Sequence, residues 1–210
     1  MNGVAHATVG GIVGGLVGIS VGIEPVSVEM VTLVSIGGIA GLIPDLDTNG
    51  MLSGKLTISH KLIKSLAILI GFLMTVYSFL ERVGYEKWLG IGIGLGIMIL
   101  ASKFITQKRM LLMTSIGVVI GGLLLGTTWI WLMGVYIGVA SFLPHRSYTH
   151  SLIGLAYFGY IAYLLSLDFN QIEGLFLVLV LGYISHLICD FKIFNKRGVK
   201  LFQPFLKMEI

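Results

Sequence analysis

"MLLMTSIGVVIGGLLLGTTWIWLMGVYIGVASFLP" (residues 110–144) runs for 35 residues without a charged side chain or a histidine. One straight helix of that length would be about 50 Å long, whereas the hydrocarbon core of a bilayer is about 30 Å thick. We therefore expect two shorter membrane helices, at 110–125 and 127–143, joined by a turn near residues 126–128. A re-entrant pair of helices is the alternative.

The whole chain has the composition of a multi-pass membrane protein. It is 56% hydrophobic and 11% charged, with a mean hydropathy of +0.96, whereas soluble domains carry about 25% charged residues. We predict one all-α helical bundle, a single domain over residues 1–210, with about eight transmembrane segments. Beyond the two above, these are expected at residues 4–23, 28–43, 62–80, 88–102, 150–167 and 172–190.

The basic residues support an even number of crossings. With eight crossings, one side of the membrane receives 12 of the 14 lysines and arginines, and only Arg82 and Lys87 fall on the other. By the positive-inside rule, this basic side and both chain termini are cytoplasmic. If residues 110–143 formed one span, every later loop would change sides and the asymmetry would be lost.

Glycines recur in patterns that favour close helix packing. Gly10, Gly14, Gly18 and Gly22 are spaced by four residues, a pattern that allows membrane helices to approach closely. The stretch "GIGIGLGI" (90–97) lacks the preceding strand and the lysine of a phosphate-binding loop, so we predict a packing role there too. The single Cys189 excludes an internal disulfide.

The histidines and most of the aspartates fall on one side of the membrane in this topology. His186 and Asp190 are four residues apart, so their side chains share one helix face. Asp168 lies on the opposite side. All five histidines and three of the four aspartates lie at helix ends on the cytoplasmic side: His6, Asp45, Asp47, His60, His145, His150, His186 and Asp190.

Taken singly, such residues are commonly structural, since interfacial histidines and Asx-turns are frequent. Seven donors from several helix ends on one side instead favour a metal centre. Mixed nitrogen and carboxylate donors suit Zn²⁺, Mn²⁺ or Fe²⁺ rather than Ca²⁺, with zinc the first choice. Because one catalytic zinc uses three or four ligands, we expect two or more ions. The predicted ligands are His6, Asp45, Asp47, His145, His150, His186 and Asp190.

Three further residues have predicted roles in catalysis or substrate binding. Asp47 is a candidate catalytic carboxylate, because Asp45 or Asp47 could bridge two ions or accept a proton from the attacking water. A guanidinium binds phosphate with a planar fork, so Arg146 is expected to bind a substrate anion; an arginine that only sets the topology is the alternative. Lys55 is a weaker candidate, with contact to anionic lipid as its alternative role.

Four motifs occur in an order that resembles a known family. They are His6, "GLIPDLD" (41–47), "HRSYTHS" (145–151) and "GYISHLICD" (182–190), the last followed by "RGVKLFQPF" (197–205). The chain resembles the YdjM-like family of prokaryotic inner-membrane proteins, described as membrane-bound metal-dependent hydrolases. The family pattern falls on His6, Asp45, Asp47, His145, Arg146, Thr149, His150, Ser151, His186, Asp190, Gly198 and Pro204.

This resemblance implies supporting roles for Thr149 and Ser151 beside the ligands. His60 is also expected to have a supporting role, although it matches no position of the family pattern. The chain departs from the family at Ile193, where a threonine is common, and Gly198 is displaced. The ligand pattern is also similar, more distantly, to the all-helical zinc phospholipase C and P1 nuclease superfamily, which implies phosphoester hydrolysis.

These expectations together predict a metal-dependent hydrolase of the inner membrane, with its site at the cytoplasmic interface. Its substrate would be a lipid or a lipid-linked phosphoester, attacked by metal-activated water. The alternatives are a non-catalytic scaffold or sensor held together by metal, and a transporter. A transporter would have ionisable residues near mid-membrane, which these spans almost lack. Nucleic-acid binding is not expected, because no recognition motif is present, and the oligomeric state is left open.

Overall fold

The computed structural model describes residues 2–47, 51–56, 59–144, 147–191, 198 and 201–202, and every regular element within them is helical. The all-α prediction is confirmed, and each of the eight predicted segments coincides with one long helix. A short helix, α3, and two 3₁₀ helices were not predicted. The elements are α1 (Gly3–Ser20), α2 (Val28–Ala40), η1 (Ile43–Asp47), α3 (Met51–Leu56), α4 (His60–Glu81), α5 (Gly84–Phe104), α6 (Gln107–Leu124), α7 (Thr128–Phe142), η2 (Tyr148–His150), α8 (Leu152–Asp168) and α9 (Leu175–Cys189).

The long uncharged run folds as two packed helices, α6 and α7, as predicted. The turn between them depends on Gly126, whose φ of 66° is a left-handed conformation that glycine adopts without strain. Its N–H donates to the carbonyl oxygen of Leu123 at 3.2 Å, and the N–H of Thr127 donates to that of Gly122 at 2.9 Å. These two bonds are a Schellman motif, which ends α6.

Length divides the eight apolar helices into two groups. Among the described residues, α1, α4, α5 and α6 are long and apolar enough to cross a membrane, whereas α2, α7, α8 and α9 are shorter apolar helices. With 15 residues, α9 is about 22 Å long, less than the thickness of the hydrocarbon core. Multiple apolar helices are therefore established, and eight complete crossings remain a prediction.

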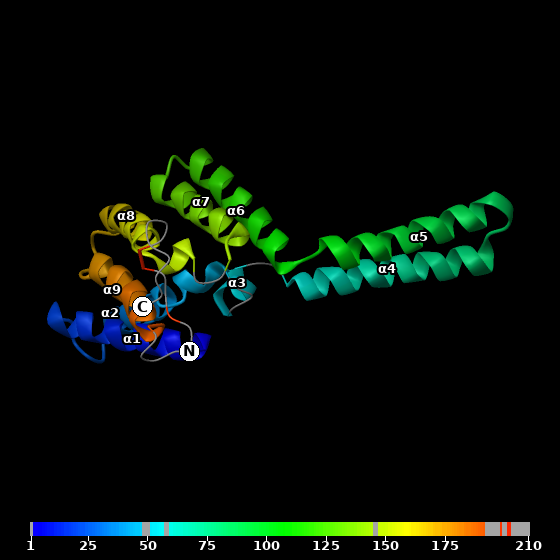
Figure 1. Cartoon of the computed structure of the whole chain (residues 1–210). Helices are drawn as coiled ribbons and strands as arrows, with labels where there is room; N and C mark the ends of the chain where they lie inside the picture. The colour runs from blue at the N-terminus through cyan, green and yellow to red at the C-terminus, as the bar shows by residue number, and fades with distance from the viewer. Residues whose placement is uncertain are drawn as a thin grey trace.

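Helices α4 and α5 form a hairpin that projects away from the other helices (Figure 1). Gly90 and Gly94 of α5 face α4, where a Cβ at Gly90 would meet the Ser78 side chain and one at Gly94 would meet Thr75. Gly92 and Gly96 have open space around them. The packing role predicted for "GIGIGLGI" (90–97) is thus confirmed for two of its glycines and wrong for the other two.

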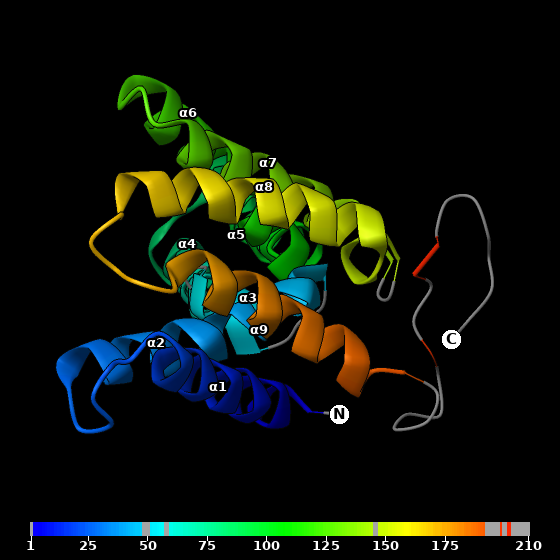
Figure 2. The same ribbon diagram turned by 90° about the vertical axis from the view of Figure 1, so that its left-hand side faces the viewer.

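Glycines also bring α1, α2 and α9 together. Gly10 and Gly14 of α1 lie against the α2 backbone so closely that a Cβ would collide with it, and Gly18 lies against Met30. In Figure 2, α9 lies beside the α1–α2 pair, and α8 lies along the other side of α9. This packing brings the start of α1 and the ends of α2 and α9 to the same end of the molecule.

Gly22 has another role than the packing that its spacing predicts. Among the described residues, no atom beyond its chain neighbours lies within 4 Å of a Cβ built on it, and its φ is 82°. Its N–H donates to Ile19, and the N–H of Ile23 donates to Gly18, which completes a Schellman motif at the end of α1. The four-residue spacing thus predicts three packing positions correctly and is wrong at the fourth.

Candidate metal centre

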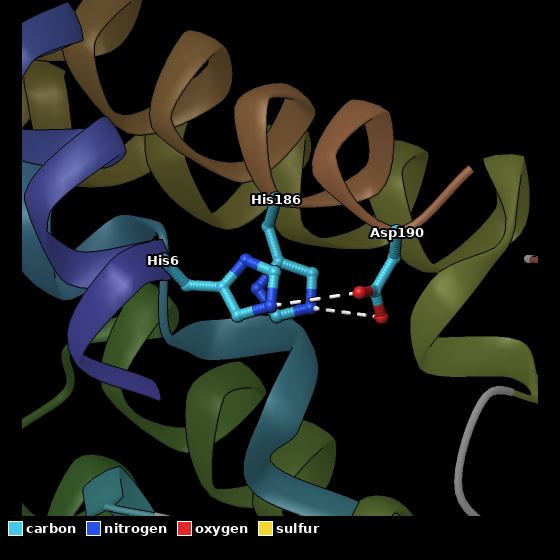
Figure 3. A group of neighbouring side chains, drawn as sticks. All are labelled: His6, His186 and Asp190. Carbon is cyan, nitrogen blue, oxygen red and sulfur yellow. Dashed lines mark ion pairs between the residues drawn. The ribbon is translucent and has the colours of Figure 1, made fainter. Parts of the chain in front are cut away.

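Five of the predicted ligands meet in the structure: His6, Asp45, His150, His186 and Asp190, which we call the histidine–aspartate cluster. They come from the start of α1, from η1, from η2 and from the end of α9. Figure 3 shows three of them, with the side chains of His6 and His186 directed toward Asp190. Asp45 is 18% exposed, whereas the other four are at most 2% exposed.

Short local motifs position the two middle segments of the cluster. After α2 ends, the N–H of Asp45 donates to the carbonyl oxygen of Leu42 at 3.2 Å, which begins η1. His150 closes η2 by donating its N–H to Ser147 at 3.0 Å. The next residue, Ser151, is buried and caps α8 by accepting from the N–H of Gly154 at 3.3 Å. Ser151 thus caps the helix that begins next to His150, and its supporting role beside a metal ligand stays a prediction.

Two histidine nitrogens of the cluster lie near each other and near two of its carboxylates. The two Nε2 atoms of His150 and His186 lie 3.1 Å apart. Each of them lies 3.6 Å from Oδ1 of Asp45, and they lie 3.8 and 3.9 Å from Oδ2 of Asp190. Ligands bound at 2.0–2.2 Å around one tetrahedral zinc would be separated by about 3.3–3.6 Å. The separations of 3.1 and 3.6 Å among His150, His186 and Asp45 are close to this range, and these three residues have metal-ligand spacing.

Hydrogen bonds determine which ring nitrogens carry hydrogen. Nδ1 of His186 lies 2.7 Å from the carbonyl oxygen of Gly41, which can only accept, so this nitrogen is the donor. Nδ1 of His150 lies 3.1 Å from the hydroxyl oxygen of Thr149. That hydroxyl donates its hydrogen to Oδ2 of Asp47 at 2.7 Å, so its oxygen accepts from His150.

In the neutral rings, both Nε2 atoms therefore present lone pairs. Two lone pairs facing each other at 3.1 Å repel unless a cation lies between them. Histidine ligands of metals commonly donate their other ring N–H to a carbonyl or carboxylate partner, as His186 does here. The donor chemistry thus fits a divalent metal held by His150, His186 and Asp45, a group with metal-ligand spacing.

Asp190 also reaches a further histidine. Its Oδ1 lies 3.6 Å from Nε2 of His6, and the His6 ring stacks on that of His186 with centroids 3.8 Å apart. Nδ1 of His6 is buried without a hydrogen-bond partner in the part of the chain that the structure describes. His6, His186 and Asp190 form a second group with metal-ligand spacing. Because His186 has one lone-pair nitrogen, it can serve only one ion.

The environment of Asp45 favours its charged form. Burial alone would raise the pKa of this carboxyl group, but the neighbouring imidazoles of His150, His186 and His6 outweigh burial and lower the pKa. A carboxylate must be deprotonated to bind a metal. Asp45 is therefore available as a ligand at neutral pH.

Asp47 lies on the far side of His150 from the converging atoms. It is 4% exposed, it accepts from Thr149, and its Oδ2 lies 3.7 Å from Nδ1 of His150. These contacts orient the His150 ring, and the supporting role of Thr149 beside a metal ligand stays a prediction. The roles of Asp47 as a ligand and as a catalytic carboxylate remain predictions.

The remaining predicted residues lie elsewhere or outside the described residues. Nδ1 of His60 lies 2.6 Å from Oε1 of Gln107, and the amide of Gln107 donates to the carbonyl oxygen of Ser53 at 2.7 Å. His60 thus joins the starts of α4 and α6 to α3, whereas the cluster is built from α1, η1, η2 and α9. Lys55 is exposed on α3. Outside the described residues lie His145, Arg146, Ile193 and Pro204.

Two contributors to the site were not predicted. Gly41 acts through its backbone carbonyl, for which the sequence offers no side-chain signal. Tyr183 is fully buried, donates its hydroxyl hydrogen to the carbonyl oxygen of Thr149 and lies 3.0 Å from the hydroxyl of Tyr136. Its position three residues before His186, on the same helix face, was the available signal.

The comparisons with known proteins give one match. The family described as "YdjM inner membrane protein" matches residues 1–210 of the chain. No curated protein matches the chain, and no solved structure matches it.

Proposed function

The chain belongs to the YdjM inner membrane protein family, and we propose from this and from the geometry of the cluster that it is a metal-dependent hydrolase embedded in that membrane. The resemblance predicted from the motifs is thereby confirmed at the level of the family. The more distant likeness to the zinc phospholipase C and P1 nuclease superfamily stays a prediction. The proposed substrate is a lipid or a lipid-linked phosphoester.

The convergence of the Nε2 atoms of His150 and His186 on two carboxylates carries this proposal. These donors would hold a divalent cation, with zinc the first choice and manganese or iron as alternatives. When bound, such an ion supplies Lewis acidity and makes a water molecule easier to deprotonate. His6 and the second oxygen of Asp190 would begin a second metal position, consistent with the expectation of more than one ion.

The residues of the chain orient the reaction. Thr149 and Asp47 hold the ring of His150, and the Gly41 carbonyl holds that of His186, so the donors are arranged before a substrate binds. Asp45 is the most exposed member of the cluster at 18%, so we propose that water and substrate approach beside it. Arg146 and Lys55 are the proposed contacts for a substrate anion.

The substrate class follows from the place of the site. The cluster lies where apolar helices end, and the positive-inside rule assigns these ends to the cytoplasmic side. A lipid headgroup in the inner leaflet would lie at this depth, whereas a soluble substrate would not require a chain of apolar helices. We therefore propose lateral access from the inner leaflet to the cytoplasmic interface.

The first test is the metal content of the purified protein by elemental analysis. We expect near-stoichiometric zinc, manganese or iron in the wild type, and its loss in both His150→Ala and His186→Ala. His60→Ala is the matched control, because this histidine bonds Gln107, and it should retain the metal. A folded wild type that binds no metal even after reconstitution would overturn the hydrolase proposal. Hydrolysis of lipid phosphates is then assayed on the metal-loaded protein.

The near-complete burial of the cluster favours a second candidate, a non-catalytic scaffold whose helix ends are joined by metal. Structural metal sites are closed, whereas catalytic sites keep an open ligand position. The two candidates differ in the visible spectrum of the protein loaded with Co²⁺. Inorganic phosphate should shift the absorption bands if a ligand position is open. Unchanged bands at saturating phosphate would favour the scaffold.

A further inference from the structure

An apolar recess lies between α7 and α8, next to η2. Its volume is about 190 Å³, and its walls include Val135, Tyr136, Val139, Leu143, Ile153 and Tyr157. Val139 is 51% exposed and Ile153 is 45% exposed, so the recess opens on the outer surface of these two apolar helices. In a membrane, that surface faces lipid.

Hydrogen bonds hold three hydroxyl groups of the walls away from the recess. The hydroxyl of Tyr136 lies 3.0 Å from that of Tyr183, and Tyr157 donates its hydroxyl hydrogen to the carbonyl oxygen of Leu132 at 3.1 Å. Thr149, also in the wall, donates its hydroxyl hydrogen to Asp47. What these residues present to the recess is therefore hydrocarbon, which suits an apolar occupant.

The recess lies next to the histidine–aspartate cluster. Thr149 lines it and directly precedes His150, and the hydroxyl of Thr149 lies 3.1 Å from Nδ1 of that histidine. Tyr183, which bonds Tyr136 in the wall, lies one helical turn before His186 in α9. An amphiphilic molecule with its polar group at the cluster would therefore have its chain close to the recess.

The size of the recess decides how much of such a chain it holds. An apolar cavity of about 150 Å³ accommodates a benzene ring, so a recess of about 190 Å³ holds a short run of methylenes and not a whole lipid chain. Lipid tails are as apolar as leucine side chains, so a chain that moves from the bilayer into the recess gains little hydrophobic free energy. The recess would instead position the polar end of the lipid.

We propose that this recess binds the first methylenes of the hydrocarbon chain of an amphiphilic phosphate ester, and that it thereby places the ester at the cluster. The inference rests on the proposed function, and it specifies the substrate as a molecule whose chain begins close to the phosphate. Val139 and Ile153 would be determinants of specificity at the mouth of the recess.

Photocrosslinking tests the proposal without requiring turnover. The probe is dodecyl phosphate with a diazirine near its phosphate end, added to the full-length, metal-loaded protein in lipid nanodiscs. We expect the label, mapped by mass spectrometry, to concentrate on α7 and α8. Val139→Trp should lower the labelling of α7 and α8 about fivefold, since an indole side chain fills a space of this size. Ile153→Trp should lower the labelling in the same way.

The matched control is Ile116→Trp on α6, because Ile116 is 46% exposed and does not line the recess. This variant should leave the label on α7 and α8 unchanged. Unlabelled dodecyl phosphate should compete with the probe, whereas inorganic phosphate should compete only weakly. A label spread evenly over the lipid-facing helices, or unaffected by both tryptophan variants, would overturn the inference.

The inference and the proposed function can fail separately. If the label stays on α7 and α8 while the protein binds no metal and hydrolyses no lipid phosphate, the recess is a lipid site and the hydrolase proposal is wrong. If metal and hydrolysis are present but the label is scattered, the recess inference is wrong and the hydrolase proposal stands.

Discussion

At the scale of single residues, the site depends on hydrogen bonds that orient two imidazole rings. Thr149 has a central place, because its hydroxyl donates to Asp47 and accepts from Nδ1 of His150. The carbonyl oxygen of Gly41 accepts from Nδ1 of His186 and orients that ring. Without these partners, each ring could rotate or adopt the other tautomer, and its Nε2 lone pair would no longer be directed at the metal position.

Replacement of Thr149 tests this arrangement. Thr149→Val keeps the shape of the side chain but removes the hydroxyl, so we expect metal affinity to fall about 10–100-fold, as is typical when a partner of a ligand is lost. Competition titration with a chromophoric chelator measures the change. Thr149→Ser retains the hydroxyl and should bind metal nearly as the wild type does. Equal affinities for the two variants would contradict the orienting role.

At the scale of elements, the site depends on how closely α9 approaches α2. A Cβ at Gly182 of α9 would lie 2.8 Å from Cβ of Ala40 and 3.0 Å from the carbonyl oxygen of Gly37. The end of α2 leads directly into Gly41 and Asp45, and the end of α9 carries His186. Small residues between these helices therefore bring the ligands within range of one another.

Gly182→Ala should separate these two helices. We expect a loss of about 1–3 kcal/mol in the free energy of unfolding, typical of overpacking, together with weaker metal binding as His186 moves away from Asp45. Gly96→Ala is the control, because Gly96 lies within a helix and has open space around it. It should be neutral or stabilising by up to about 1 kcal/mol. Thermal unfolding in detergent compares the two variants, and equal midpoints would contradict the packing argument.

Much at this scale could be predicted from the sequence. The eight apolar segments correspond to eight helices, and the turn at Gly126 lies where the uncharged run exceeds the length of one span. Both results follow from local properties, namely hydrophobic length and the left-handed preference of glycine. The role of Gly22 was mistaken because a four-residue spacing does not distinguish a packing glycine from one that ends the helix.

At the scale of the whole molecule, the arrangement in the membrane is the main prediction that remains to be tested. The α4–α5 hairpin projects away from the other helices (Figure 1), and four helices are shorter than a full span. The charge asymmetry nevertheless favours eight crossings, with both termini and the cluster on the cytoplasmic side.

Cysteine accessibility in a Cys189→Ser background tests this topology. With eight crossings, Leu125→Cys and Arg82→Cys should react with a membrane-impermeant maleimide added to intact cells, whereas Lys108→Cys should react only after the inner membrane is permeabilised. A re-entrant α6–α7 pair would instead leave Leu125→Cys unreactive from outside. Labelling of Lys108→Cys in intact cells would contradict the cytoplasmic placement of the cluster.

The sequence by itself determined the all-helical class, the positions of the long helices, the family, and a set of candidate ligands near helix ends. These depend on composition, on local periodicity and on short motifs. Only the tertiary structure decided that His150 and His186 meet Asp45 and Asp190, that Asp47 lies behind His150, and that His60 bonds Gln107. The physical reason is that these contacts join residues far apart in the chain, such as His186 and Gly41, 145 positions apart. Their distances follow from how closely glycines let the helices pack.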